Sequence, residues 1–398
     1  MIERKAYFQQ IEPFIGKNVI KVLVGVRRAG KSTLLDMLRE YLLSQGTSPH
    51  SILHIKFESA EYTSIRTSAD LVDYVKSNLD TSQPITLLLD EIQEVKDWEK
   101  ALRSFMVDYQ ADMYITGSNA HVLSSDLATY ITGRYVTIPV YPLSFSEFLP
   151  AYKEEYSQAD MREAFRAFVT QGGFPFQNEL SFNQSATLKY LSDLSSTILL
   201  KDVVQRNAIR DVDLLERLVR YTVSEEGHLV SAKKIADYIK SDYRKTSQET
   251  IANYLQAAEK AYLLYEVPRE DTVGKKILAF NQKYYVVDQG LRQALGFDNW
   301  SNIDQVLEGI VCLELKRRGY DLSVGKVGNQ EIDFVARRKG QVEYYQVCYL
   351  IADKNTEDRE FGALELLGDN YPKYVLSLDE FPRSRNGIQG LNLIDWLQ

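Results

Sequence analysis

Eight consecutive residues near the amino terminus restrict the folds open to this chain more than any other segment. The run Gly25-Val26-Arg27-Arg28-Ala29-Gly30-Lys31-Ser32 matches the pattern G-x-x-x-x-G-K-[ST] at every defined position. A β-branched run at 19–24 predicts a buried strand before it, and leucines at helical spacing over 31–44 predict a helix after it. A strand, a glycine-rich turn and a helix in this order surround an anion with backbone N–H groups and the positive end of a helix. The run therefore predicts an α/β fold with a phosphate-binding loop.

Each position of this loop has an expected role in binding a nucleoside triphosphate. Glycines let the backbone approach the phosphate oxygens, Lys31 reaches the β- and γ-phosphates, and the Ser32 hydroxyl ligates Mg²⁺. The sequence holds no Asn-Lys-x-Asp motif for reading guanine, so we expect ATP as the nucleotide. The residues predicted to bind it are Gly25, Arg28, Ala29, Gly30, Lys31, Ser32 and Thr33.

A second predicted strand ends in two carboxylates. Residues 85–89 are apolar except for Thr86 and lead directly into Asp90 and Glu91. In a parallel sheet such a strand delivers its last side chains to the carboxyl edge, where ligands bind. We expect Asp90 to hold Mg²⁺ together with Ser32, and Glu91 to orient and deprotonate the attacking water.

Two further polar segments complete the predicted site. A strand at 113–116 runs into Gly117-Ser118-Asn119, where a side chain can touch the γ-phosphate or the attacking water. We assign this role to Asn119, with Ser118 as the alternative. Arg134 is predicted to place a cation near the γ-phosphate, either in its own chain or in a neighbouring subunit, because such a cation stabilises transition-state charge.

Composition excludes several other classes of protein. The 398 residues are too many for one ordinary core, so several domains are expected. No apolar run reaches the roughly 18 residues needed to cross a bilayer, and no secretory signal is visible. The two cysteines, Cys312 and Cys348, fit no metal spacing and are expected to be buried and unpaired, as in a cytoplasmic protein. A net charge of −8 argues against non-specific coating of nucleic acid, although a local basic face remains compatible with it.

The alternation of strands and helices indicates a parallel, doubly wound sheet over the first third of the chain. We expect helices at 5–16, 71–79 and 98–109, and a further strand at 52–57. Beyond Pro150 the pattern is largely helical to 215, with a turn at Gly172-Gly173-Phe174-Pro175. Residues 230–270 suggest two helices and a hairpin, and 306–350 a helix followed by two strands.

The order of these segments resembles a family of prokaryotic AAA+-type P-loop ATPases whose C-terminal half is a domain of unknown function. The resemblance covers nearly the whole chain. It rests on the double arginine of the loop and on the segments Leu89-Asp90-Glu91-Ile92-Gln93, Thr116-Gly117-Ser118-Asn119, Gly133-Arg134, Pro142-Leu143-Ser144-Phe145-Ser146-Glu147-Phe148 and Gly172-Gly173-Phe174-Pro175. It implies an ATPase core at 1–150, a helical connector at 151–215, a winged helix at 216–290 and a restriction-endonuclease-like domain at 291–398.

The expected winged helix carries a cluster of basic residues. Ser231 and Ser247 are suitable N-caps for two helices, and segments 262–268 and 277–287 can form the wing hairpin. If this part binds duplex DNA, phosphate contacts are expected from Lys233, Lys234, Arg244 and Lys245, with Lys240 nearby. The alternative is a winged helix that only packs against protein, its lysines forming a solvated face.

The endonuclease-like domain departs from the pattern that it resembles. Glu308 and Asp333 occupy the positions of two metal-binding carboxylates, but the E-x-K segment reads Gln346-Val347-Cys348. The lysine is absent and one carboxylate has become an amide, so we expect no nuclease activity. Lysines elsewhere that could replace the missing one are Lys326, Lys339 and Lys354.

Together these features predict a cytoplasmic Mg²⁺·ATPase that acts as a nucleotide-driven switch, with DNA as one partner to consider. One alternative is a protein-interaction switch that hydrolyses ATP slowly and has no nucleic-acid role, acting on a protein partner or in a homo-oligomer. The other is an ATP-regulated nuclease.

Overall fold

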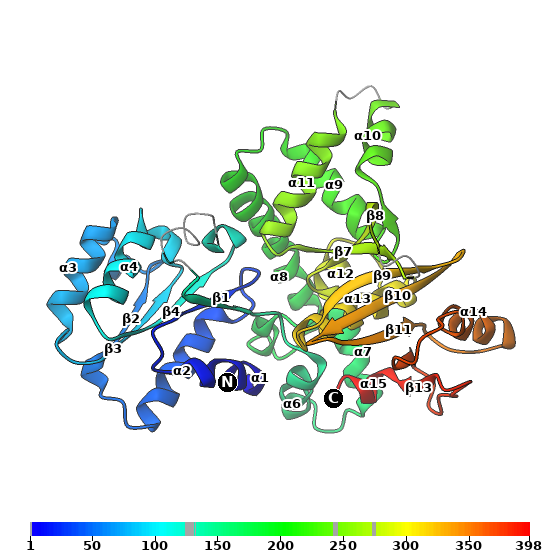
Figure 1. Ribbon diagram of the computed structural model, residues 1–398, viewed down its shortest axis with the longest axis horizontal. Helices are drawn as coiled ribbons and strands as arrows, with labels where there is room; N and C mark the ends of the chain where they lie inside the picture. The colour runs from blue at the N-terminus through cyan, green and yellow to red at the C-terminus, as the bar shows by residue number, and fades with distance from the viewer. Residues whose placement is uncertain (1, 124–130, 132, 242–245, 273–275) are drawn as a thin grey trace. The chain divides into compact units, whose positions relative to one another are not determined.

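The chain folds into two compact units (Figure 1). The computed structural model describes every residue except 1, 124–130, 132, 242–245 and 273–275. The first unit contains residues 1–140 together with 260–262, and the second contains 141–259 and 263–398. Arg244 and Lys245, two of the predicted DNA contacts, lie outside the described residues.

The first unit is built on a five-stranded parallel sheet in the order β2-β3-β4-β1-β5. The strands are β1 (Ile20–Val24), β2 (Ile52–Lys56), β3 (Ile85–Asp90), β4 (Ala111–Gly117) and β5 (Tyr135–Pro139). The helices are α1 (Lys5–Ile11), α2 (Lys31–Ser44), α3 (Ser68–Asn78) and α4 (Trp98–Asp108). Short 3₁₀ turns occupy Glu12–Phe14, Pro49–Ser51, Ala60–Tyr62, Ile92–Glu94 and Ala120–Leu123. The expected alternation of strands and helices is therefore confirmed.

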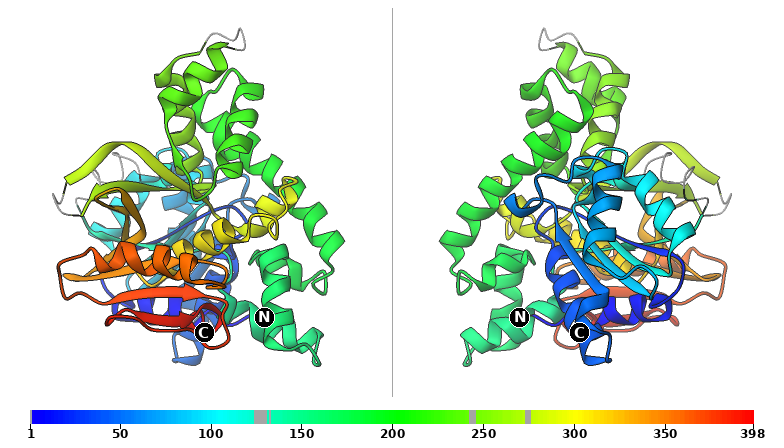
Figure 2. Two further views of the ribbon diagram at one scale, coloured as in Figure 1. Left: turned by 90° about the vertical axis from the view of Figure 1, so that its right-hand side faces the viewer. Right: turned by 90° about the vertical axis from the view of Figure 1, so that its left-hand side faces the viewer.

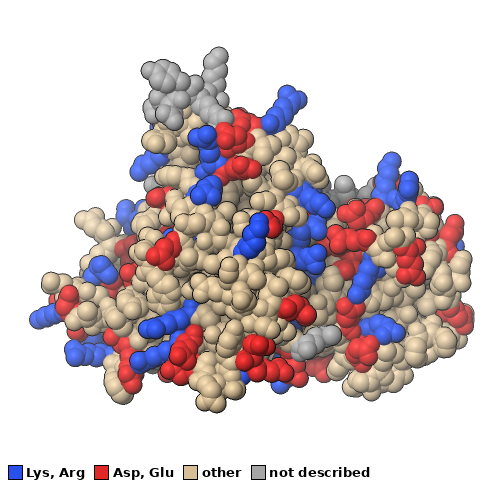
Figure 3. Space-filling model, turned by 180° about the vertical axis from the view of Figure 1, so that it is seen from behind, with Lys and Arg blue, Asp and Glu red and all other residues tan. Residues whose placement is uncertain are grey.

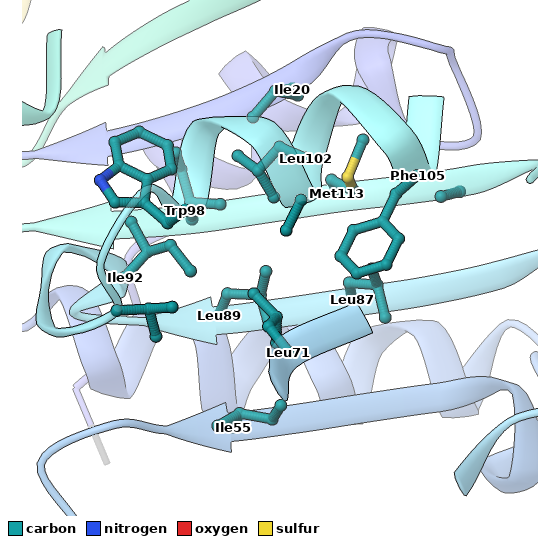
Figure 4. Packing of buried hydrophobic residues seen from close by; sticks show 14 of the residues in the cluster. Ile20, Ile55, Leu71, Leu87, Leu89, Ile92, Trp98, Leu102, Phe105 and Met113 are labelled. Carbon is teal, nitrogen blue, oxygen red and sulfur yellow. The ribbon is translucent and has the colours of Figure 1, made fainter. Parts of the chain in front are cut away.

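Helix α4 shows how the sequence pattern produces this packing. Its buried residues recur three or four positions apart and so form one apolar stripe. In Figure 4, Leu102 and Phe105 of α4 lie over the sheet near Leu87 and Met113. Strand β3 is buried along its whole length, as expected for a parallel strand covered on both faces.

Two helix boundaries differ from those expected. Helix α3 begins at Ser68, three residues early, because Thr67 and Asp70 form a reciprocal capping box. Helix α1 ends at Ile11 and continues only as a 3₁₀ turn containing Pro13, which cannot donate a backbone hydrogen bond. Neither difference affects the expected position of the phosphate loop between β1 and α2.

The strand order decides which loops meet. Strand β4 lies between β1 and β3 and pairs with both in parallel. The carboxyl ends of all three strands therefore share one edge of the sheet. The segment after β4 consequently stands between the glycine-rich loop after β1 and the carboxylates that end β3.

The second unit combines helices with an eight-stranded mixed sheet. Its strands are β6 (Leu229–Val230), β7 (Leu264–Asp271), β8 (Lys276–Val286), β9 (Asp321–Val327), β10 (Gln330–Arg338), β11 (Gln341–Val347), β12 (Lys373–Ser377) and β13 (Gln389–Asn392). Its helices are α6 (Phe145–Glu155), α7 (Met161–Gln171), α8 (Gln184–Thr197), a π-helix (Ile198–Gln205), α9 (Val212–Ser224), α10 (Ala232–Ser241), α11 (Gln248–Lys260), α12 (Gln289–Ala294), α13 (Ile303–Arg317), α14 (Lys354–Glu365) and α15 (Leu393–Trp396). A 3₁₀ turn occupies Pro175–Asn178.

The order of elements from α9 to β8 supports the expected two helices and hairpin. Strand β8 pairs antiparallel with β6 and β7, and helices α9, α10 and α11 lie together in both views of Figure 2. Both predicted caps form, since the Ser231 and Ser247 hydroxyls accept hydrogen bonds from the backbone of α10 and α11.

Two features of the second unit were not expected. The stretch after α13 contains three strands, not two, because 321–327 forms β9. Strand β9 also pairs in parallel with β7, so a single sheet runs from β6 to β13. The expected winged helix and nuclease-like segment therefore share one sheet.

Two of the segments that carry the family resemblance contact each other within the second unit. The carbonyl of Gly173 accepts a hydrogen bond from Leu143 N (2.7 Å). The buried Asp288 carboxylate accepts from Gly173 N (2.6 Å) and Gly290 N (2.8 Å). A side chain at Gly173 would overlap the Leu143 backbone, which explains why glycine stands there. The residues 142–145 and 172–174 are all buried, so the two segments meet in the interior of this unit.

Other expectations concern burial. Both cysteines are buried and unpaired, as predicted. Over the ranges that the structure describes, no helix is both long and apolar enough to cross a membrane.

Candidate active site

The glycine-rich loop between β1 and α2 has a backbone that side chains would obstruct. Gly25 has φ +151°, and a Cβ there would overlap the carbonyl oxygen of Val140. Gly30 has φ +97°, the left-handed conformation from which α2 begins. These two glycines allow the chain to turn sharply and to start a helix whose first N–H groups are unpaired.

Lys31 is buried at the start of α2, with its ammonium inside the turn of the loop. Its Nζ donates to the carbonyl oxygens of Gly25 (2.9 Å) and Val26 (3.0 Å). The loop therefore surrounds the ammonium with its own oxygen atoms.

Asp90 ends β3 and is only 5% exposed. Burial raises the pKa of its carboxyl group, while hydrogen bonds from the Thr116 and Ser32 hydroxyls act in the opposite direction. The Thr116 hydroxyl donates to Asp90 Oδ1 at 2.5 Å. The hydrogen bond between Ser32 and Asp90 joins the two predicted metal-binding residues, from separate segments of the chain, at one point.

Glu91 adopts a left-handed backbone conformation, with φ +56°. Its N–H donates to the Thr116 hydroxyl oxygen (2.8 Å), and its carboxylate accepts a hydrogen bond from the Gln93 side-chain amide. A non-glycine residue in this region is uncommon, and such backbone strain concentrates at functional sites. The conformation turns Glu91 away from the strand direction while keeping it buried.

Thr116 links these two acids, and the sequence interpretation gave it no role. Its one hydroxyl accepts from Glu91 N and donates to Asp90. The signal available in the sequence was its place at the end of β4, but only the strand order puts that end beside β3.

Ser118 and Asn119 follow β4 at the same edge, and both are fully buried. They follow the strand that lies between β1 and β3. Which of the two would contact a γ-phosphate stays a prediction.

Arg134 lies at the amino-terminal end of the strands, opposite the end that carries the phosphate loop. Its carbonyl accepts a hydrogen bond from Ile20 N (3.0 Å), and the next residue, Tyr135, pairs with Ile20 at the start of β1. Gly25 follows the far end of β1, about 16 Å away at the usual rise of a strand. The geometry therefore gives no support to a role for Arg134 at its own loop and leaves the neighbouring-subunit alternative as the prediction.

Arg4 contacts the loop, although the sequence interpretation did not select it. It is 5% exposed, its NH1 donates to Ala29 O (3.1 Å), and its guanidinium lies 4.5 Å from the centre of the Tyr7 ring. A single arginine in a segment of alternating apolar and polar residues matches no motif, so the sequence does not predict this contact and only the fold reveals it.

The donor set suits a hard cation that has other ligands besides protein. Among the residues that the structure describes, no group of three or more His, Cys, Asp or Glu side chains is arranged to hold a metal. Ser32 and Asp90 therefore offer two oxygen ligands, which fits Mg²⁺ because that ion keeps waters and phosphate oxygens as its remaining ligands.

The predicted DNA-contacting lysines that the structure describes lie on α10. Lys233, Lys234 and Lys240 are exposed. The neighbouring α11 exposes Gln248, Asn253 and Gln256. On the face of the molecule shown in Figure 3, basic and acidic side chains are interspersed.

The two nuclease-like carboxylates do come together in the second unit. Glu308 and Asp333 both face the ammonium of Lys283, at 2.7 Å and 3.6 Å. Burial raises the pKa of Asp333 well above its usual value, Glu308 adds to this increase, and Lys283 opposes it. Lys283 was not among the lysines that the sequence suggested.

Comparisons with known proteins agree with this architecture. Residues 17–149 match the family described as "AAA domain", and residues 162–304 match "Domain of unknown function (DUF8612)". An uncharacterized protein of Haemophilus influenzae is 37% identical over 100% of this chain and 98% of its own length. An uncharacterized protein of Methanocaldococcus jannaschii is 32% identical over 91% of this chain and 81% of its own. A Walker-type ATPase of Pyrococcus abyssi matches 75% of this chain and 96% of its own, with a TM-score of 0.52 and 14% identity, which confirms the α/β P-loop fold.

Proposed function

The chain belongs to the family of its full-length Haemophilus influenzae relative, with an AAA domain at 17–149, and on this premise we propose that it binds Mg²⁺·ATP and hydrolyses it. One observation carries the proposal. The Lys31 ammonium, the Ser32 hydroxyl and the Asp90 carboxylate meet at the end of one buried strand, beside a loop whose backbone requires glycine.

Each of these groups has a defined task in the proposed reaction. The Lys31 ammonium leaves the carbonyl oxygens of the loop and binds β- and γ-phosphate oxygens, and the first N–H groups of α2 face the same anion. Ser32 and Asp90 would hold Mg²⁺, which when bound supplies positive charge against the phosphates. Thr116 keeps Asp90 in place for that purpose.

Glu91 is the proposed base for the attacking water. Its carboxylate is buried and oriented by Gln93, so the carboxylate is held in one direction before substrate binds. Asn119, or Ser118 in its place, would position the water or sense the γ-phosphate. In this proposal Arg134 acts only from a neighbouring copy, because it lies at the opposite edge of its own sheet.

Two matched pairs of variants test the proposal. Lys31→Ala should abolish tight binding of a fluorescent ATP analogue, whereas Lys76→Ala, at an exposed lysine of α3, should not. Glu91→Gln should retain binding and lose roughly 10²-fold or more in phosphate release, whereas Glu94→Gln, three residues on and exposed, should stay near wild type. Unchanged affinity in Lys31→Ala would refute the nucleotide site, and turnover within about threefold of wild type in Glu91→Gln would refute the base.

We also propose that duplex DNA is the partner of the switch. The support is chemical: α10 exposes lysines suited to phosphates, and α11 exposes amide side chains of the kind that read adenine in the major groove. Affinity for a short duplex should fall with salt, with a log–log slope near −0.9 per phosphate contact, and the Lys233→Ala/Lys234→Ala variant should reduce that slope by about two. Absence of binding at low salt would instead favour the alternative of a protein partner.

A further inference from the structure

Lys283 of β8 is a buried lysine whose ammonium is surrounded by carboxylates. Its side chain is 3% exposed. The Nζ atom lies 2.7 Å from Glu308 Oε1, 2.8 Å from Glu331 Oε1 and 3.6 Å from Asp333 Oδ1. The Tyr285 hydroxyl donates to the same oxygen of Glu308. The Lys283 ammonium therefore lies between three carboxylates, one from α13 and two from β10.

The endonuclease-like resemblance implies a divalent metal at this place, and the residues present do not fit one. Glu308 and Asp333 would be its carboxylate ligands, and their oxygens face the Lys283 ammonium. The third ligand position holds Gln346, whose amide oxygen accepts a hydrogen bond from Asp333 N at 3.3 Å. Cys348, at the position of the assisting lysine, is buried.

An ammonium and a divalent ion cannot share this space. The Nζ distances of 2.7 and 2.8 Å are close to the 2.3–2.6 Å of Ca²⁺–oxygen bonds, so both cations would need the same point between the same oxygens. Two positive charges at that separation in a buried site repel strongly. The lysine comes from the same chain and does not dissociate, so it has the advantage over a dissolved ion.

We propose that Lys283 is a permanent internal cation that takes the place of a divalent metal among Glu308, Glu331 and Asp333. The domain then keeps acids at the positions of metal ligands, but with Lys283 among them the described residues contain no group arranged to hold a metal. The ion pairs join strand β8 to α13 and β10. A lysine that assists a nucleophilic water works beside a metal and reaches the substrate. Lys283 instead directs its ammonium at three acids and is shielded from solvent, so the geometry favours replacement of the metal over assistance.

The proposal predicts that removing the lysine creates a cation site. In Lys283→Ala the acids Glu308 and Asp333 lose their counter-charge, while Glu331 keeps Arg269 at 3.8 Å, so the full-length variant should unfold at a lower temperature in EDTA. Millimolar Mn²⁺ should restore several degrees to this variant and change wild type and Lys153→Ala, an exposed-lysine control on α6, by about 1 °C or less. Tb³⁺ luminescence sensitised by Tyr285 should show binding about tenfold or more tighter than in wild type.

The outcomes are distinguishable even if Lys283→Ala is poorly folded. The variant Lys283→Ala/Glu308→Gln/Asp333→Asn removes the buried charge and should be folded and indifferent to Mn²⁺. If Lys283→Ala is recovered from urea only when Mn²⁺ is present, the proposal is supported. It is overturned if Mn²⁺ stabilises wild type as much as Lys283→Ala, or if Lys283→Ala gains nothing from Mn²⁺ in either stability or refolding. Because these readouts do not involve ATP, their failure is separate from failure of the proposed hydrolysis.

Discussion

Replacing Thr116 by valine tests whether its hydroxyl holds the two acids of the site in position. Valine has nearly the same shape, so the change removes the hydroxyl and leaves the packing of β4 in place. The hydroxyl makes two hydrogen bonds in a buried environment, to Asp90 Oδ1 (2.5 Å) and from Glu91 N (2.8 Å). In Thr116→Val, Asp90 Oδ1 and Glu91 N both lose their hydrogen-bond partner.

The size of the effect follows from these two contacts. A hydrogen bond to a charged group contributes about 1.5–3 kcal/mol, and a buried N–H left without a partner costs about 1–3 kcal/mol. Because the two share one hydroxyl they do not simply add, and we expect a loss of about 2–4 kcal/mol in the free energy of unfolding. With a slope of about 2 kcal/mol per molar urea, the midpoint of unfolding should fall by about 1–2 M.

The assay is urea unfolding followed by tryptophan fluorescence, in parallel with phosphate release at saturating ATP. Thr116→Ser is the matched control, since it keeps the hydroxyl and loses only a methyl group. We expect turnover to fall in Thr116→Val much more than in Thr116→Ser, because Asp90 and Glu91 both lose a fixed partner. If the valine variant is as stable and as active as the serine variant, the Thr116 hydroxyl does not hold the two acids in position.

Three further predictions address other parts of the molecule. Burial raises the pKa of Asp90, so its carboxyl group should become protonated at a higher pH than that of an exposed aspartate. The affinity for Mg²⁺·ATP should therefore fall as the pH drops through this pKa. In Asp90→Asn the affinity should lack this pH dependence. Gly173→Ala should destabilise the second unit by about 2 kcal/mol or more, because its Cβ would overlap a backbone carbonyl, whereas Gly368→Ala, where a Cβ meets no atom within 4 Å, should be nearly neutral in thermal unfolding. If Arg134 acts from a neighbouring copy, mixing Arg134→Ala with Lys31→Ala should restore part of the ATPase activity that each lacks alone, and no recovery at any mixing ratio would count against that role.

Local patterns were sufficient for the phosphate loop and its neighbours. The strand before Gly25, the helix after Gly30 and the apolar strand that ends at Asp90 all lie within a few residues of where the sequence placed them. They were predictable because a buried strand, a left-handed glycine and an apolar helical stripe are each specified by residues close together in the chain. The caps at Ser231 and Ser247 were predictable for the same reason.

Contacts between distant segments required the tertiary structure. Thr116 reaches Asp90 only because β4 lies between β1 and β3, and Arg134 is distant from its own loop only because β5 runs parallel to β1. Lys283 meets Glu308 from 25 residues away along the chain, on a strand that the sequence assigned to a separate domain. The sequence determined which local elements form and where the phosphate loop lies. The pairing order of the strands decided which charges meet, because side chains far apart in sequence are brought within hydrogen-bonding distance only by the packing of the whole sheet.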